Sequence, residues 1–422
     1  MILENTFFAR LNDFVYLYPL LMTIVWIVGG VIFYLRRERG IESAPELDEY
    51  PFFSILVPCH NEESMIENTV NRLTEMRYPD YEIIAIDDGS TDKTLSVLKE
   101  LAKKIKNFRV ITLTENQGKA VALNVGSLAA KGDLILSLDA DTLLSRDALK
   151  WMAWHFVKFP RVGAVTGNPR VLNRSSLLAK IQVGEYATII GLIKRTQRLL
   201  GKILTVSGVI AAFRKQALFS VGFWDNDMVT EDIDITWKLE KKFWDIRFEP
   251  KALCWVLVPE TLRGLWIQRV RWAQGGVEVL IKHRGVFTSW KQRRIWPVYF
   301  EYGLSIFWAY MFLFLILVWI LQHLGLFGFW VNVPPPIPPK WTGSILAMVC
   351  LLQFFVSLII EKQYEKSIFR YYFWIIWYPF CYWLISIFTL AYAFPKAIFK
   401  PRGKRAVWKS PDRGLQDERK PA

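Results

Sequence analysis

The 422 residues of this chain are enough for one sizeable α/β domain together with membrane segments. Hydrophobic residues make up 52% of it and 19 residues are Trp, a content typical of chains with aromatic residues at membrane interfaces. The formal charge of +14 does not indicate nucleic acid, because the Lys and Arg residues gather beside apolar segments and in the tail. The four cysteines are widely spaced and signal neither a zinc site nor a disulfide framework.

The first apolar segment, residues 14–35, carries no charge and is long enough to span a bilayer. Arg36, Arg37 and Arg39 follow it, whereas a cleaved signal peptide carries its positive charge before the apolar run. We therefore expect a membrane anchor with its N-terminus outside. The domain that follows should lie in the cytosol.

Residues 51–260 alternate short β-branched runs with segments of helical length, such as 62–75 and 91–104. The expected strands are 53–57, 82–86, 109–113, 133–138 and 162–166. This alternation predicts an α/β domain with a parallel-rich sheet covered by helices. Ligands of such sheets bind beyond the carboxyl ends of the strands, so the polar residues at those ends are the candidate site.

The first two strands end in polar segments, VPCHNEE at 57–63 and DDGSTD at 87–92. Either segment alone is equally well explained as turn and helix-cap chemistry. Their occurrence on successive strands favours a nucleotide pocket, in which the Asp88 carboxylate accepts hydrogen bonds from a uracil or a ribose. No GxGxxG motif follows the first strand, which argues against a dinucleotide dehydrogenase.

The segment NQGK at 116–119 follows the third strand and opens a helix over 120–128. Its backbone amides and the Lys119 ammonium can meet a diphosphate at the helix N-terminus. The alternative is an ordinary surface lysine beside a turn glycine. The neighbouring motifs favour the phosphate role.

The motif DAD at 139–141 ends the most hydrophobic strand. Residues two apart in an extended segment project to the same side, so Asp139 and Asp141 can approach one hard cation. Mg²⁺ or Mn²⁺ held there would bridge to diphosphate oxygens and neutralise a departing diphosphate. A DxD motif also occurs in ordinary turns, but its place after a buried strand favours the metal site.

The motif TED at 230–232 precedes a helical segment. As plain helix chemistry, Thr230 would be the N-cap and the two acids, Glu231 and Asp232, would favour the helix dipole. As catalytic chemistry, Asp232 would be the general base that takes a proton from an acceptor hydroxyl. One carboxylate can serve both purposes.

The motif QRVRW at 268–272 lies in an amphipathic segment, 262–282, that is rich in Trp and Arg. A helix lying in a membrane interface has this composition. The planar guanidinium of Arg271 also suits a diphosphate, and Trp272 offers a flat face to a sugar. The two interpretations are compatible.

Three further apolar runs follow, at 302–322, 341–360 and 371–395, with a proline-rich segment at 333–339. Four crossings from an external N-terminus would place the basic tail that begins at Lys396 outside, against the preference of Lys and Arg for the cytosolic face. We therefore expect that the last run, interrupted by Pro379, is not a simple span.

Taken together, these motifs resemble those of the inverting family 2 glycosyltransferases, in the processive group with cellulose, chitin and hyaluronan synthases. Asp88, DAD, TED and QRVRW match that family's four signatures. Within the group, the chain is most similar to the bacterial synthases of β-1,6-linked poly-N-acetylglucosamine in biofilms. This narrower resemblance rests on segments 165–170, 181–186, 191–198, 205–214 and 410–414.

The resemblance implies a GT-A type domain and UDP-N-acetylglucosamine as the donor to a growing polysaccharide. Asp88 would contact the uridine, Asp139 and Asp141 the metal and diphosphate, and Asp232 would be the base. The other substrate-binding residues it implies are Lys119, Glu231, Gln268, Arg271 and Trp272.

The resemblance also implies a multi-pass protein of the bacterial inner membrane with a cytosolic catalytic domain. A small two-span membrane partner and activation by cyclic diguanylate are carried over from Gram-negative relatives. Those relatives have an additional apolar segment before the catalytic domain. This chain has a single apolar segment there. The expected division is an anchor at 1–36, the glycosyltransferase domain at 37–260, interfacial helices at 261–300, membrane helices at 301–395 and a basic tail at 396–422.

Three alternatives remain open. A sister synthase of chitin, hyaluronan or cellulose would differ only in donor and linkage. A lipid-linked monosaccharide transferase generally lacks the QxxRW motif that is present at 268–272. A catalytically inactive receptor or export channel would not need intact acids at every motif.

Overall fold

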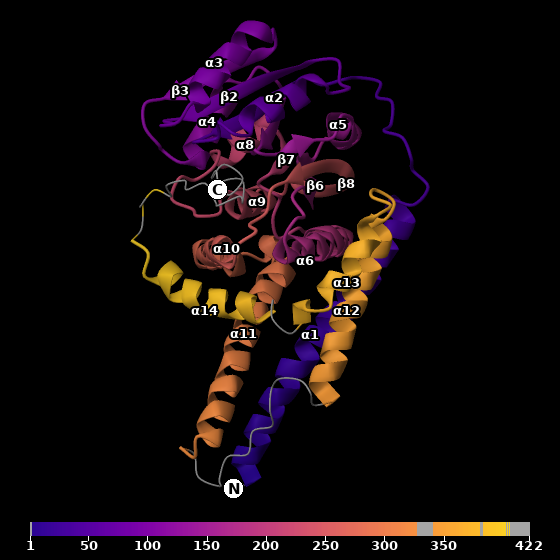
Figure 1. Cartoon of the computed structure of the whole chain (residues 1–422), viewed down its shortest axis with the longest axis vertical. Helices are drawn as coiled ribbons and strands as arrows, with labels where there is room; N and C mark the ends of the chain where they lie inside the picture. Colours follow the sequence, from indigo (N-terminus) through magenta and orange to yellow (C-terminus); the bar gives the residue numbers. More distant parts are fainter. Residues whose placement is uncertain (1, 327–340, 380–382, 402, 404, 406–422) are drawn as a thin grey trace, which may run out of the picture.

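The computed structural model describes residues 2–326, 341–379, 383–401, 403 and 405 (Figure 1). The proline-rich segment at 333–339 and residues 406–422 of the basic tail lie outside these ranges. A mixed α/β domain forms one end of the molecule, and long helices project from it.

One mixed sheet forms the centre of the domain, in the order β3-β2-β1-β4-β7-β6-β8-β5. Strands β3, β2, β1 and β4 run parallel, β7 pairs antiparallel with both β4 and β6, and β8 is parallel to β6. The strands are β1 (Phe53–Cys59), β2 (Tyr81–Asp88), β3 (Phe108–Leu113), β4 (Leu134–Leu138), β5 (Leu143–Leu144), β6 (Val162–Val171), β7 (Ile210–Arg214) and β8 (Asp245–Val256).

The five strands predicted from the sequence are confirmed as β1, β2, β3, β4 and β6, while β5, β7 and β8 were not predicted. Phe53 of β1 lies opposite both Tyr81 of β2 and Leu134 of β4. Because these strands start level and run parallel, their carboxyl ends open on the same edge of the sheet. The polar segments after β1, β2 and β4 therefore meet there.

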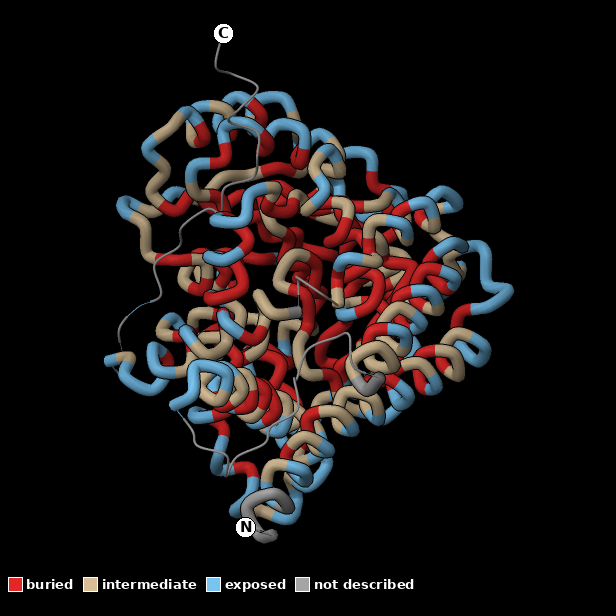
Figure 2. Tube along the Cα trace, turned by 60° about the horizontal axis from the view of Figure 1, so that its bottom comes forward, coloured by how far each residue is buried: buried red, intermediate tan, exposed pale blue. Residues whose placement is uncertain are grey.

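Side chains alternate between the two faces of the sheet and build one apolar core on each. Ile55 and Ile83 belong to one core, whereas their neighbours Leu56 and Ile84 belong to the other. The covering helices are α2 (Ile66–Thr74), α3 (Thr94–Lys104), α4 (Lys119–Ala129), α5 (Ala148–Lys158), α8 (Lys215–Val221) and α9 (Glu231–Lys241). Figure 2 shows the buried residues concentrated in this domain.

A second group of helices lies on the side of the domain from which the long helices project (Figure 1). Here α6 (Leu177–Glu185), the π-helix η1 (Tyr186–Leu192) and α7 (Ile193–Leu200) follow one another without a break. The amphipathic segment predicted as helical is α10 (Leu262–His283), which is followed by the short 3₁₀ helices η2 (Arg284–Thr288) and η3 (Trp290–Gln292).

Three helices are long and apolar enough to cross a membrane among the described residues: α1 (Ile2–Arg37), α11 (Trp296–His323) and α12 (Trp341–Glu361). The apolar run at 371–395 is divided between α13 (Tyr372–Ile375), which follows η4 (Ile368–Tyr371), and α14 (Trp383–Ile398). In Figure 1, α14 lies across the direction of α11. Among its described residues this run contains no helix long enough to span a membrane, and the expectation that it is not a simple span stays a prediction.

Candidate active site

Hydrogen bonds join the loops after β1 and β2. The Asn61 side-chain oxygen accepts from the Thr91 amide at 2.8 Å, and the Asp92 carboxylate accepts from the Glu63 amide at 3.2 Å. Asn61 and Asp92 thus bond backbone amides, as expected of turn and helix-cap residues. Asp87, by contrast, is buried, and its Oδ1 has no hydrogen-bond partner among the described residues. A buried acceptor without a donor is costly unless a ligand satisfies it.

The Asp88 carboxylate is fully buried and accepts one hydrogen bond from each of the Gln117 and Gly118 amides, both at 2.8 Å. Gly118 has φ +95°, a conformation that strains residues with a Cβ. Asp88 thus fixes the loop that carries Lys119. Its predicted contact with the uridine stays a prediction.

Lys119 opens α4 and points into a cluster of acids. Its Nζ lies 2.5 Å from Asp139 Oδ1 and 3.2 Å from Glu231 Oε1, and it donates to the Gly208 carbonyl at 3.2 Å. Burial disfavours the ammonium, but the carboxylates of Asp139 and Glu231 outweigh it and raise the pKa of Lys119. The side chain is only 15% exposed, so Lys119 is not an ordinary surface lysine.

Asp139 and Asp141 follow β4 in the middle of the sheet, and Asp141 is buried. Among the described residues, no three acids, histidines or cysteines are gathered as a ready-made metal cage. Mg²⁺ does not need one, because it is usually bound through one or two carboxylates together with substrate phosphates and water. The pair therefore fits a cation that is held jointly with a diphosphate.

Asp232 lies in the first turn of α9. Its Oδ1 accepts from the Ile233 amide at 2.9 Å, and its Oδ2 accepts from the Gly208 amide at 3.2 Å. Burial and the neighbouring Glu231 raise the pKa of Asp232 to about 6, against the opposing charges of Lys119 and Arg271. A carboxyl with a pKa near the working pH is suited to general-base catalysis.

The helix-cap interpretation of Thr230 is wrong for its side chain. Thr230 makes no side-chain cap to α9, and its hydroxyl is buried without a hydrogen-bond partner among the described residues. A Cβ placed on Gly275 of α10 would lie 2.0 Å from that hydroxyl oxygen. Thr230 instead packs directly against α10, which brings the helix with the QRVRW motif close to Asp232.

On α10, Gln268 is buried with its Oε1 unpaired among the described residues, while Arg271 is exposed and Trp272 half-buried. Arg269, which received no role from the sequence, pairs with Glu185 at 2.6 Å and lies 4.3 Å from the centre of the Trp272 ring. The charge of Arg271 reaches Asp232, which places the motif at the same site.

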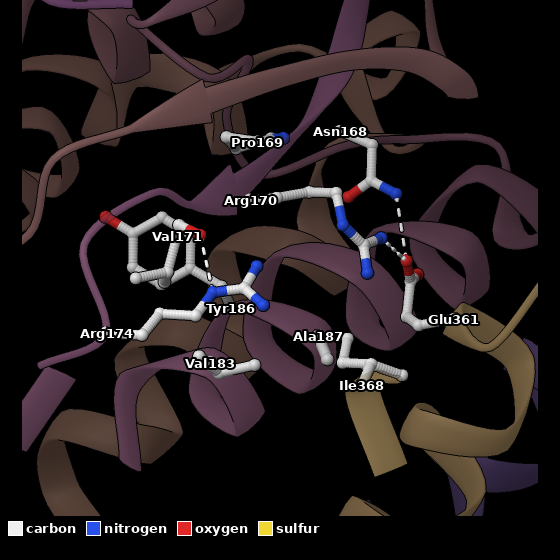
Figure 3. Close-up of a pocket in the computed structure, with 10 residues that line it drawn as sticks. All are labelled: Asn168, Pro169, Arg170, Val171, Arg174, Val183, Tyr186, Ala187, Glu361 and Ile368. Carbon is white, nitrogen blue, oxygen red and sulfur yellow. Dashed lines mark hydrogen bonds and ion pairs between the residues drawn. The ribbon is translucent and has the colours of Figure 1, made fainter. Parts of the chain in front are cut away.

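Two hollows lie in this part of the molecule. Figure 3 shows one near the end of α12, and none of the predicted site residues lines it. The other lies behind the acids and is lined by Leu123, Ser137, Val206, Gly208, Ala211, Phe213, Trp224, Glu231 and Asp232. The predicted chemistry is thus associated with the second hollow.

Sequence reasoning gave no role to Lys194, Ser207 and Gly208, although they belong to segments that carry the family resemblance. Lys194 is buried and donates to the Ser207 hydroxyl at 2.6 Å. Burial lowers the pKa of Lys194 to about 7, and the charge of Asp232 opposes that shift. Lys194 stands in a polar, basic segment, GLIKRTQR at 191–198, where a buried lysine has no local sequence signal.

Comparisons with known proteins identify the family of this chain. The model of the glycosyltransferase-like family 2 matches residues 51–275. The chain is 42% identical to a poly-β-1,6-N-acetyl-D-glucosamine synthase of Staphylococcus aureus over 95% of its length and 98% of the relative's. It is 41% identical to the synthase of the same name from Staphylococcus epidermidis, with the same coverage.

A solved mannosyltransferase from Pyrobaculum calidifontis, in complex with GDP-mannose and Mn²⁺, has the same fold. Its TM-score is 0.55 at 19% identity, over 93% of this chain and 100% of the other. The GT-A type fold predicted from the sequence is confirmed. The strands, the acidic cluster and the near full-length relatives lead to one conclusion: this chain belongs to glycosyltransferase family 2 and is a membrane protein.

Proposed function

We propose that this enzyme polymerises N-acetylglucosamine from UDP-N-acetylglucosamine into a β-1,6-linked chain. The observation that carries the proposal is the continuous contact from Asp139 through Lys119 to Gly208 and Asp232. It supports a single site that contains both the proposed diphosphate-binding lysine and the proposed base. The choice of sugar and linkage is supported by the two staphylococcal synthases.

Asp139 and Asp141 are the residues that would hold Mg²⁺ or Mn²⁺. The bound cation would supply charge neutralisation for the departing diphosphate. Asp139, Glu231 and Asp232 lie around one buried cation, Lys119, and this excess of negative charge supports the assignment.

The chain's own residues then account for one displacement with inversion at the anomeric carbon. Asp232 takes the proton from the 6-hydroxyl of the acceptor sugar as that oxygen attacks, and UDP leaves. Lys119 and Arg271 hold the diphosphate, Asp88 fixes the nucleotide loop, and Gln268, Glu231 and Trp272 orient the acceptor. The attacking oxygen and the leaving group lie on opposite faces of the sugar, so an α-linked donor gives a β-linked product.

The test uses membranes that contain the full chain. UDP release is followed with UDP-N-acetylglucosamine, UDP-glucose and UDP-glucuronate, and the product is treated with a β-1,6-specific hydrolase. We expect release from the first donor alone and a polymer that the hydrolase cuts. Release from another donor, or a resistant polymer, would replace the product assignment with that of a sister synthase.

We also propose that the protein crosses the bacterial inner membrane three times, through α1, α11 and α12. An odd number of crossings from an external N-terminus leaves the catalytic domain and the basic end of α14 on the cytosolic side, as the distribution of Lys and Arg favours. The segment 261–300 would lie at the interface, where Trp290 is 70% exposed.

We further propose that the same chain secretes the polymer, supported by the packing of α10, which carries Trp272, along α14 beneath the domain. In sealed vesicles with the active site facing outward, new polymer should accumulate in the lumen. Polymer that remains entirely outside would contradict export.

The two-span partner and activation by cyclic diguanylate are further proposals, supported by the resemblance to Gram-negative synthases. Both are tested by adding each component to the UDP-release assay separately and together. Activity that is complete with the chain alone would remove both from the scheme.

A further inference from the structure

Lys194 is a buried lysine next to the proposed active site. Lys194 is 5% exposed, and its Nζ donates a hydrogen bond to the Ser207 hydroxyl at 2.6 Å. Removing an amine from water is costly, so a lysine is kept in such a place only where its hydrogen bond matters. Nothing in the reaction described above uses this amine.

Ser207 and Gly208 connect Lys194 to the proposed base. The Gly208 amide donates to Asp232 Oδ2 at 3.2 Å, and the Gly208 carbonyl accepts from Lys119 at 3.2 Å. A Cβ on Gly208 would lie 3.1 Å from the same Asp232 oxygen, so the backbone approaches the proposed base closely. The position of this dipeptide therefore sets the hydrogen bond that Asp232 receives.

The helix that carries Lys194 is itself fixed by the helices that cross the membrane. The next residue, Arg195, forms a bidentate ion pair with Glu38, in which its Nε and Nη2 lie 2.8 and 2.6 Å from the two carboxylate oxygens. Its Nη1 lies 2.6 Å from Glu361 Oε1. Glu38 directly follows α1, and Glu361 ends α12. Figure 3 shows Arg170 and Asn168 of β6 pointing toward the same Glu361 carboxylate.

We propose that Lys194 is a positioning residue for Asp232: by holding Ser207, it presents the Gly208 amide to the carboxylate. This inference rests on the proposed role of Asp232 as the base. The inference also means that the contacts of α7 with α1 and α12 couple the position of those helices to the orientation of Asp232. Lys194 acts through the dipeptide and does not touch the sugar.

The test compares Lys194→Met, Ser207→Ala and the double variant in membranes with UDP-N-acetylglucosamine. Each single variant should lower kcat about tenfold, the equivalent of one lost hydrogen bond, and leave the KM for the donor within about twofold. Because both changes break the same contact, the double variant should be no worse than the more severe single one. Lys215→Met, which removes a lysine that donates to the Ala130 carbonyl away from the site, is the matched control.

A second readout separates positioning from general weakening of the fold. Loss of a hydrogen bond to the Asp232 carboxylate raises the pKa of Asp232. In a plot of kcat against pH, the fall in kcat at low pH should therefore move to higher pH in both single variants. Ser207→Ala removes one hydroxyl, and it keeps the test valid even if Lys194→Met fails to fold.

The outcomes distinguish this inference from the proposed function. If Asp232→Asn keeps its turnover, the base assignment fails whatever Lys194 does. If Asp232→Asn is inactive while Ser207→Ala has the wild-type kcat and pH profile, only the positioning role is overturned. Additive losses in the double variant would overturn it as well.

Discussion

Two groups of buried charges in this protein differ in how completely they are paired. Near the ends of α1 and α12, three acids, Glu38, Glu361 and Glu365, meet three guanidinium groups, those of Arg170, Arg174 and Arg195. At the proposed active site, three acids, Asp139, Glu231 and Asp232, lie around the buried Lys119. Balanced charges hold a structure together, whereas an excess of acid is suited to a cation and a proton that arrive with the substrate.

Removal of a charge should have different consequences in the two groups. In the first group, a deleted charge leaves its partners buried and unpaired, so stability should fall. In the second, deletion of one acid relieves repulsion, so the fold should persist while turnover is lost.

The largest expected effect is on turnover. Asp232→Asn should lower kcat by about 10²- to 10⁴-fold, because the amide cannot accept the acceptor's proton. UDP release measures the loss, and thermal unfolding in detergent should match that of the wild type. Asp147→Asn, in a surface pair with Arg77, is the control that should keep full activity. Equal losses in both variants would show that the assay responds to charge in general.

The next effect is on stability. Arg195→Met leaves Glu38 and Glu361 buried without their shared partner and should cost about 3–5 kcal/mol of unfolding free energy. Arg146→Met breaks an exposed pair with Glu75 and should leave the unfolding free energy almost unchanged. Denaturation of both variants in the same detergent gives the difference. A similar small cost for both would contradict the stabilising role assigned to the group at the ends of α1 and α12.

A smaller effect is expected where α1 meets α7. A Cβ on Gly29 would lie 2.3 Å from the Thr196 methyl group, so Gly29→Ala should destabilise the protein by about 1–3 kcal/mol. Gly303→Ala is the matched control, since a Cβ there meets nothing within 4 Å. Unfolding of the two variants is compared side by side, and equal stability would mean that α1 is free to shift.

The smallest effect is a shift of the pH profile. The free enzyme should lose kcat/KM as the pH falls through about 6, because the base must be ionised. Glu231 raises the pKa of Asp232, so Glu231→Gln should move this acid limb to lower pH. A limb that moves to higher pH would contradict the proximity of the two carboxylates.

The sequence predicted the edge of the sheet at which the site lies, because the motifs follow strands with clear β-branched runs. It did not predict β7, which enters the sheet antiparallel between β4 and β6 and places Ser207 and Gly208 beside Asp232. Pairings across long stretches of chain, such as Arg195 with Glu38, leave no local pattern. Lys119 was identified for a diphosphate, but its pairing with Glu231 needed the folded structure.

The close packing of α1 on α7 bears on how the protein can be divided. Leu192 fills the space beside Gly30, and the Thr196 hydroxyl donates to the Trp26 carbonyl at 2.9 Å. A fragment that lacks residues 1–38 would lose these surfaces and both hydrogen bonds from Arg195 to Glu38. The apolar side of α7 would then face water, and Arg195 would keep only its contact with Glu361. The anchor is thus an integral part of the enzyme, and a heterologous transmembrane segment fused in its place could not restore the catalytic domain.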